Sequence, residues 1–153
     1  MHYSFLEWEY RILLVVSYQA FWDSLVDDLK HFIPCYVRVI RVLVEIRDAI
    51  NDLAGRKESH AINEAIDIDL IKQQTELGAF GWVCCKNLVA SVLCIIMRIQ
   101  APSRDVSTHE RWKIVGTSME RAERQDHNGI FCKALEFLLD LVNILRIDAA
   151  NAR

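Results

Sequence analysis

Two acidic residues two positions apart are the first feature of the chain that could do chemistry. Asp67 and Asp69 follow Glu64, and such carboxylates could bind a metal ion or serve as acid and base in an enzyme. On a helix, residues two apart point in different directions, so Asp67 and Asp69 cannot chelate one ion. We expect one of them to face solvent and the other to form a buried polar network with Gln73 and Gln74 that fixes helix register. The enzyme alternative predicts a deep pocket lined by these carboxylates.

The histidines and cysteines show no metal-binding or nucleophilic pattern. No two of the five histidines are three or four positions apart, and the five cysteines include no Cys-x-x-Cys pair. No GxSxG, HExxH, Walker or GxGxxG motif occurs. The sequence therefore predicts a non-enzymatic protein with no catalytic residue, no metal ligand and no cofactor. We expect reduced thiols in a cytoplasmic protein, with Cys94 and Cys132 on apolar helix faces and Cys35 at a helix N-terminus.

One tetrapeptide has a regulatory pattern. In Arg56-Lys57-Glu58-Ser59 two basic residues precede a serine at positions −3 and −2, as a basophilic kinase such as the cyclic-AMP-dependent kinase prefers. We expect Ser59 to cap a helix N-terminus, where the free N–H groups and the helix dipole would favour a phosphate. The alternative is a solvated loop and an ordinary N-cap that is never modified.

Helices are the elements that must position these residues. The chain has 153 residues, of which 52% are hydrophobic and 25% are charged, and it contains only 5 Gly and 2 Pro. These residues can build the core of one domain but supply too few turns for a β-sandwich or barrel. The net charge of −3 argues against a nucleic-acid partner held by phosphate contacts. We expect a single all-α domain over residues 1–153.

The richest apolar run covers residues 88–97 and lies between Lys86 and Arg98. This run is much shorter than the ~20 apolar residues that a membrane-spanning helix needs. We therefore expect a central apolar helix in the core of a soluble bundle, and no membrane span.

Capping residues, glycines and prolines divide the chain into about six helices. The first expected helix opens with the Ser4-x-x-Glu7 capping box and ends near Phe32, and the second starts at Pro34 and ends at Gly55. The third is capped by Ser59 and ends at Gly78, and an apolar helix follows from about Phe80 to Ile99, where Pro102 ends it. A polar helix opens with Ser107-x-x-Glu110, and a last helix runs from Ile130 after a turn at 126–129.

The second helix has the clearest pair of faces. Its apolar seam consists of Val39, Leu43, Ile46, Ile50 and Leu53. Its opposite side carries a charged stripe of Arg38, Arg41, Glu45 and Asp48, in which Arg41 and Glu45 are at pairing distance. We expect the charged stripe to be a candidate partner-binding face. Self-association of two copies through the apolar seam is the alternative.

Five stretches occur in a defined order from about residue 20 to the C-terminus. They are Ala20–Leu25, Leu43–Asp48, Ile66–Gln74 running into Gly78, Met97–Asp105 and Leu139–Asn151. Together they resemble the T-complex protein 11 family, although Gln100 stands where that family usually has Cys. The motif residues of structural interest are Trp22, Asp23, Asp67, Asp69, Gln73, Gln74, Gly78, Pro102, Arg104 and Asp105.

The resemblance implies an all-helical, non-enzymatic regulator with no catalytic residues. The family is associated with cyclic-AMP and protein kinase A signalling and, in animals, with sperm function. Components of that kinase pathway are therefore the expected protein partners. Family members are usually much longer, so the chain would correspond to their N-terminal part.

Overall fold

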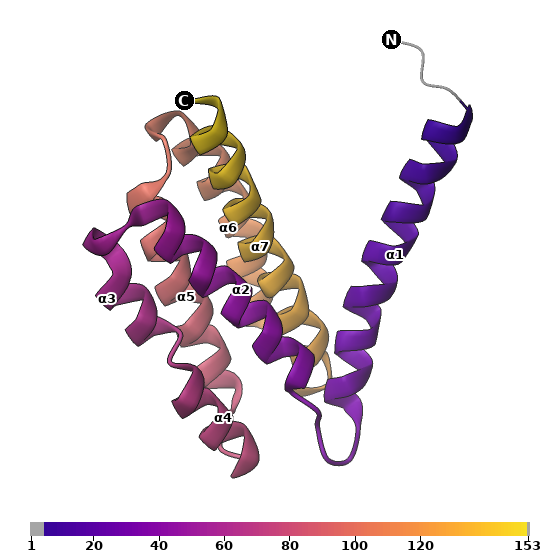
Figure 1. Cartoon of the computed structure of the whole chain (residues 1–153). Helices are drawn as coiled ribbons and strands as arrows, with labels where there is room; N and C mark the ends of the chain where they lie inside the picture. The colour runs from indigo at the N-terminus through magenta and orange to yellow at the C-terminus, as the bar shows by residue number, and fades with distance from the viewer. Residues whose placement is uncertain (1–4, 153) are drawn as a thin grey trace.

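The chain folds into an all-α structure (Figure 1), confirming the expected fold class. The computed structural model describes the backbone of residues 5–152 and the side chains of residues 17–152, and this range contains no strand. The elements are α1 (Phe5–Lys30), α2 (Val37–Ala54), α3 (Arg56–Ala65), α4 (Ile68–Glu76), α5 (Trp82–Ile99), the 3-10 turn η1 (Pro102–Arg104), α6 (Asp105–Arg121), the 3-10 turn η2 (Arg124–Asp126) and α7 (His127–Asn151).

Helix α7 organises the packing, because it lies against α1, α2, α5 and α6. The apolar helix α5 packs against α3, α6 and α7, and α2 packs against α3, α4 and α7. Figure 1 shows α1 beside the other helices at its C-terminal end and diverging from them toward its N-terminus. Six helices, α2 to α7, thus pack together, and α1 joins them through its C-terminal half.

The apolar seam of α2 is part of this core. Val39, Leu43, Ile46 and Ile50 are at most 1% exposed, and Leu53 is partly buried against them. The amphipathic pattern therefore predicted the inner face of α2 correctly. Because the seam is filled by the chain's own helices, its side chains are not free to pair with a second copy, which argues against the alternative of a dimer through this seam.

Helix α5 combines a buried face with an exposed one. It is long and apolar enough to cross a membrane by length and composition, with a mean hydropathy of 1.7 over 18 residues. Val89, Val92 and Ile96 are fully buried in the bundle, which is the packing expected of a core helix. Val83, by contrast, is 64% exposed on the other side.

Three expected helix starts are wrong. Pro34 lies in an exposed loop, and α2 begins only at Val37, because the Cys35 N–H first donates to the Asp28 carbonyl (2.9 Å) and folds the loop back on α1. Helix α6 begins at Asp105, directly after η1, so Ser107 lies inside the helix. Helix α7 begins at His127, so the expected turn at 126–129 is mostly its first turn.

Ser59 is also not an N-cap. Gly55 ends α2 with φ 63° and ψ −152°, a backbone conformation that essentially only glycine adopts. This turn leads directly into α3 at Arg56, which places Ser59 inside the helix. The Ser4-x-x-Glu7 capping box lies outside the side chains that the structure describes.

The expected third helix is two helices. The chain leaves α3 at Ile66, and Asp67 caps α4 by accepting a hydrogen bond from the Leu70 N–H (3.1 Å). This break accounts for the seven α-helices between residues 5 and 152, where six helices were expected. Gly78, with φ 67°, follows α4 as predicted.

Candidate functional site: a groove between α2 and α4

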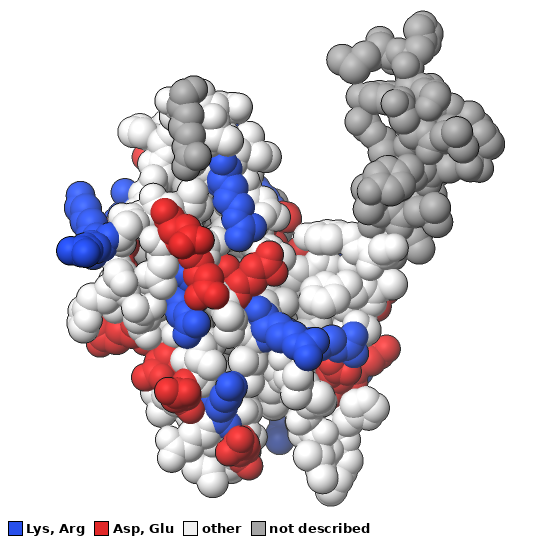
Figure 2. Space-filling view, viewed as in Figure 1, with Lys and Arg blue, Asp and Glu red and all other residues white. Residues whose placement is uncertain are grey.

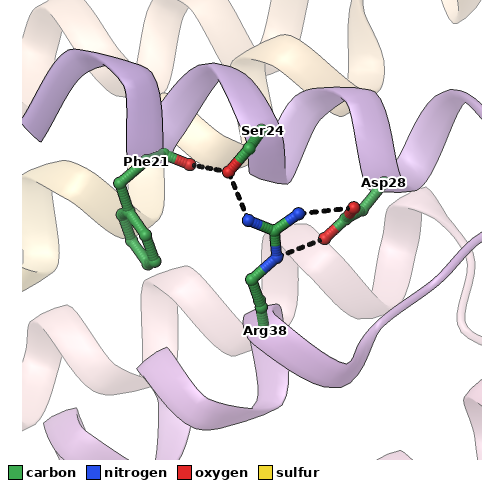
Figure 3. Close-up of polar contacts among 4 residues, drawn as sticks. All are labelled: Phe21, Ser24, Asp28 and Arg38. Atoms are coloured by element: carbon green, nitrogen blue, oxygen red, sulfur yellow. Dashed lines mark hydrogen bonds and ion pairs between the residues drawn. The ribbon is translucent and has the colours of Figure 1, made fainter. Parts of the chain in front are cut away.

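The charged stripe of α2 is largely engaged inside the molecule. The Arg38 guanidinium donates to both carboxylate oxygens of Asp28 (2.9 and 2.8 Å) and to the Ser24 hydroxyl (2.6 Å), as Figure 3 shows. Ser24 in turn donates to the Phe21 carbonyl (2.7 Å). The hydrogen bonds with Asp28 raise the pKa of Arg38. Arg38 therefore fastens α2 to α1 and does not project freely toward a partner.

The other members of the charged stripe differ in their availability. Glu45 lies 3.8 Å from Arg146 of α7 rather than pairing with Arg41, and Asp48 pairs with Arg47 (3.2 Å). Figure 2 shows charges of both signs interspersed over this face. Arg41 is exposed, and it lies at the edge of a groove, which makes it the member of the charged stripe best placed to meet a partner.

This α2–α4 groove has a volume of about 960 Å³ and opens between α4 and the loop of residues 31–36, near the lower edge of Figure 2. Its apolar lining comes mainly from the loop and from the first turns of α2. The lining residues are Ile33, Pro34, Cys35, Tyr36, Val37, Ile40, Arg41 and Val44, facing Lys72, Thr75 and Glu76 of α4.

Large apolar side chains are unusually exposed around the α2–α4 groove. Ile33 is 81% exposed and Val37 is 57% exposed, and the neighbouring Phe32 is fully exposed. Leu77, directly after α4, is 74% exposed. Clustered exposed apolar residues with a polar rim are typical of protein interaction sites. Arg41 and Lys72 place two positive charges at this rim against the one carboxylate of Glu76, so the groove, with a net positive rim, suits an apolar segment that carries carboxylates.

Sequence reasoning found only Arg41 among the residues that form the α2–α4 groove. A usable signal was present, because Phe32 and Ile33 directly precede a proline and so fall where a helix breaks. The α4 side of the groove left no such signal, because Lys72, Thr75 and Glu76 read as ordinary surface residues of a helix.

The motif residues of α1 and α4 do not form one site. Trp22 is 3% exposed and packs edge-on against Phe21, with ring centroids 5.3 Å apart. Asp23 is exposed and accepts a hydrogen bond from Gln19 (3.0 Å). In α4, Asp67, Asp69 and Gln73 are exposed and Gln74 is half-buried.

Two expectations for the carboxylates are therefore wrong. The buried polar network of Asp67 or Asp69 with Gln73 and Gln74 does not form, because the helix break turns both carboxylates outward. Glu64 is exposed as well. Glu64 and Asp67 line a surface groove beside α5 and Asp69 does not, so the three carboxylates do not share the deep pocket that the enzyme alternative requires.

The motif residues after α5 hold helix ends together. Exposed Pro102 opens η1, and Arg104 forms two hydrogen bonds with Asp148 of α7 (3.0 and 2.8 Å). Asp105 accepts from the Gln100 amide (2.7 Å), whose oxygen accepts from Thr108 (2.9 Å). These contacts fix the connection from α5 to α6.

Ser59 is half-buried within the first two turns of α3. Its hydroxyl accepts a long hydrogen bond from the Asn63 amide (3.4 Å), and Asn51 of α2 donates to the Asn63 oxygen (3.0 Å). The preceding Arg56 and Lys57 are exposed. Across the part of the chain that the structure describes, no three His, Cys, Asp or Glu residues cluster as a metal site.

A family model described as T-complex protein 11 matches residues 16–153. The chain belongs to the T-complex protein 11 family. The human T-complex protein 11 homolog is 30% identical to this family member over 91 residues, which cover 58% of this chain and 18% of the relative. The human T-complex protein 11-like X-linked proteins 1 and 2 are each 28% identical with the same coverage.

This T-complex protein 11 family member thus spans about a fifth of the length of the curated relatives it matches. No solved structure matches the chain. The family motifs identified from the sequence lie within the matched region, and two of them, residues 66–78 and 97–105, lie at helix ends and connections.

Proposed function

We propose that this chain is a non-enzymatic regulatory protein that binds an apolar, carboxylate-bearing helical segment of a protein partner in the α2–α4 groove. The observation that carries this proposal is the cluster of exposed apolar side chains around the groove, led by Ile33 and Val37. Fully covering one such side chain contributes about 1.5–3 kcal/mol. Arg41 and Lys72 would orient the partner through their charges.

Membership of the T-complex protein 11 family supports a proposal for the biological setting. We propose that binding in the α2–α4 groove modulates cyclic-AMP and protein kinase A signalling in the cytoplasm, with a role in sperm where the organism is an animal. Ser59 remains a proposed phosphorylation site of that pathway. Because its side chain is half-buried in α3, a kinase would need the first turns of this helix to open.

Retention of purified regulatory and catalytic subunits of protein kinase A on the immobilised chain tests this function. Val37→Asp should weaken retention at least about tenfold, because a carboxylate replaces an apolar contact, a change of roughly 1.4 kcal/mol. Val106→Asp is the matched control, since Val106 is 71% exposed in the first turn of α6, as Val37 is in α2. An acidic residue in a first turn is compatible with the helix dipole at both positions.

The two parts of the proposal fail separately. If the wild-type chain retains no kinase subunit, the signalling link is wrong. If a subunit is retained equally by wild type and by Val37→Asp, the partner binds elsewhere and the groove assignment is wrong.

A further inference from the structure

The outer face of α5 is a second surface that the chain leaves uncovered. Val83, Asn87, Ala90, Ser91 and Cys94 are all exposed and uncharged, and they follow one side of the helix for about three turns. A groove runs along each edge of this outer face of α5, and Asn87 lines both grooves. The outer face of α5 and the two grooves along its edges therefore form one continuous surface.

The groove between α5 and the α3–α4 pair is acidic. It has a volume of about 580 Å³ and contains the carboxylates of Glu64 and Asp67. Its one cation is Arg98, whose charge is matched by Glu58 at 2.9 Å. The exposed Leu70 adds apolar area to this acidic groove.

The groove between α5 and α6 is basic. It has a volume of about 640 Å³ and contains Lys86, Lys113 and Arg121 against one carboxylate, Glu120. Trp112 lines the basic groove as well. Its ring lies close over Gly116, where a Cβ atom would come within 3.2 Å of the ring. The basic groove and the acidic groove therefore lie on opposite edges of the same uncharged helix face.

We propose that two copies of the chain pair through the outer face of α5, related by a two-fold axis that runs parallel to this helix. Such an axis exchanges the two edges of the surface while preserving the level along α5. The basic groove of one copy then faces the acidic groove of the other, and this complementary contact occurs twice in the dimer. The surface differs from the α2–α4 groove, so pairing leaves the proposed partner site open.

The charges select this arrangement over the antiparallel one. A two-fold axis perpendicular to α5 would place basic groove on basic groove and acidic groove on acidic groove, which like-charge repulsion disfavours. The short side chains of Ala90, Ser91 and Cys94 allow two helices to approach closely in either arrangement, so they do not decide between them. Charge decides.

Charge reversal across the two grooves provides the test. Sedimentation equilibrium of the wild-type chain should show a dimer at micromolar concentration, and Lys113→Glu or Glu64→Lys alone should weaken dimerisation by roughly tenfold, because each reversal opposes two contacts per dimer. Both residues are exposed, so folding is retained. The double variant Lys113→Glu with Glu64→Lys should restore the wild-type dimer, since each copy again presents one edge of each sign.

The native Cys94 reports the direction of pairing. An axis parallel to α5 places Cys94 beside Cys94 of the second copy. Because the half-buried Cys84 also lines the acidic groove, the test uses a Cys84→Ser background. In this background a short bismaleimide should cross-link the dimer, also when Cys35→Ser is added, but not when Cys94→Ser is added. Cys35 is the control because it is also exposed, in the loop before α2, and lines neither groove beside the outer face of α5. A monomer throughout the concentration range, failure of the double variant to restore pairing, or cross-linking that survives Cys94→Ser would each overturn the proposal.

Discussion

The cysteines of this chain differ in burial, and their burial determines their thiol chemistry. Cys85 and Cys132 are buried, and desolvation raises the pKa of each thiol to about 12. Cys35 and Cys94 are exposed, and Cys84 is half-buried. The expectation that Cys94 lies on a buried face is wrong, because α5 turns Val92 and Ile96 inward and residues two positions from these point outward.

This division predicts a fast and a slow class of thiols toward a disulfide reagent at neutral pH, with the half-buried Cys84 between them. Cys35 and Cys94 should react rapidly, whereas Cys85 and Cys132 should react only when the bundle opens, because they are inaccessible and fully protonated. Ellman's reagent in the presence and absence of denaturant measures both phases. Cys94→Ser should remove its share of the fast phase only, and rapid modification of Cys85 in the native chain would contradict the packing of α5.

Several residues compete to cap the start of a helix, and Asp67 at the start of α4 is the clearest case. Its carboxylate caps α4 by accepting from the Leu70 N–H (3.1 Å), whereas Asp69 lies in the first turn of α4. Asp67→Ala should therefore lower the free energy of unfolding by about 1 kcal/mol, and Asp69→Ala by only a few tenths. Urea unfolding of both variants checks this order. Equal losses would mean that the cap contributes no more than the charge.

Helix ends were more predictable from sequence than helix starts, and the difference is physical. Gly55 and Gly78 adopt positive φ, which other residues avoid. Each of these glycines is therefore nearly sufficient by itself to predict the end of a helix. Ser59 and Ser107 match capping patterns, but a serine inside a helix is tolerated, and the preceding turns at Gly55 and Pro102 had already started α3 and α6.

The pairing of the two sides of the α2–α4 groove could not be predicted by pattern analysis for a related reason. Arg41 could be assigned to the outer face of α2 by periodicity alone, and the exposed position is as expected. Whether Arg41 meets Lys72 across a groove depends on how α4 packs against α2. That packing follows from the break at Asp67, which changes the direction of the chain between α3 and α4.

At the scale of the whole molecule, arginine–carboxylate pairs join helices that are distant in sequence. Arg98 of α5 bonds Glu58 of α3 (2.9 Å), and Arg104 bonds Asp148 of α7 (2.8 Å). The hydrogen bonds from these arginines hold the pKa of Glu58 below its ordinary value of 4.5 and that of Asp148 below 3.8. The pairs therefore make the bundle's stability dependent on pH.

The sign of that dependence follows from the direction of the shifts. A carboxylate whose pKa is lower in the folded than in the unfolded chain contributes stability above its unfolded pKa, and this contribution disappears as pH falls through the folded pKa. Wild type should therefore have a higher Tm than Glu58→Gln at neutral pH, and the difference should shrink as pH falls below 4.5 and disappear once pH is below the lowered pKa of the folded chain. Thermal unfolding followed by circular dichroism at these pH values measures the Tm difference.

Glu64→Gln is the control, because Glu64 is exposed on the same helix and its replacement should change Tm little at any pH. A Tm difference for Glu58→Gln that persists unchanged in acid would show that the side chain stabilises α3 against α5 by packing rather than through its charge.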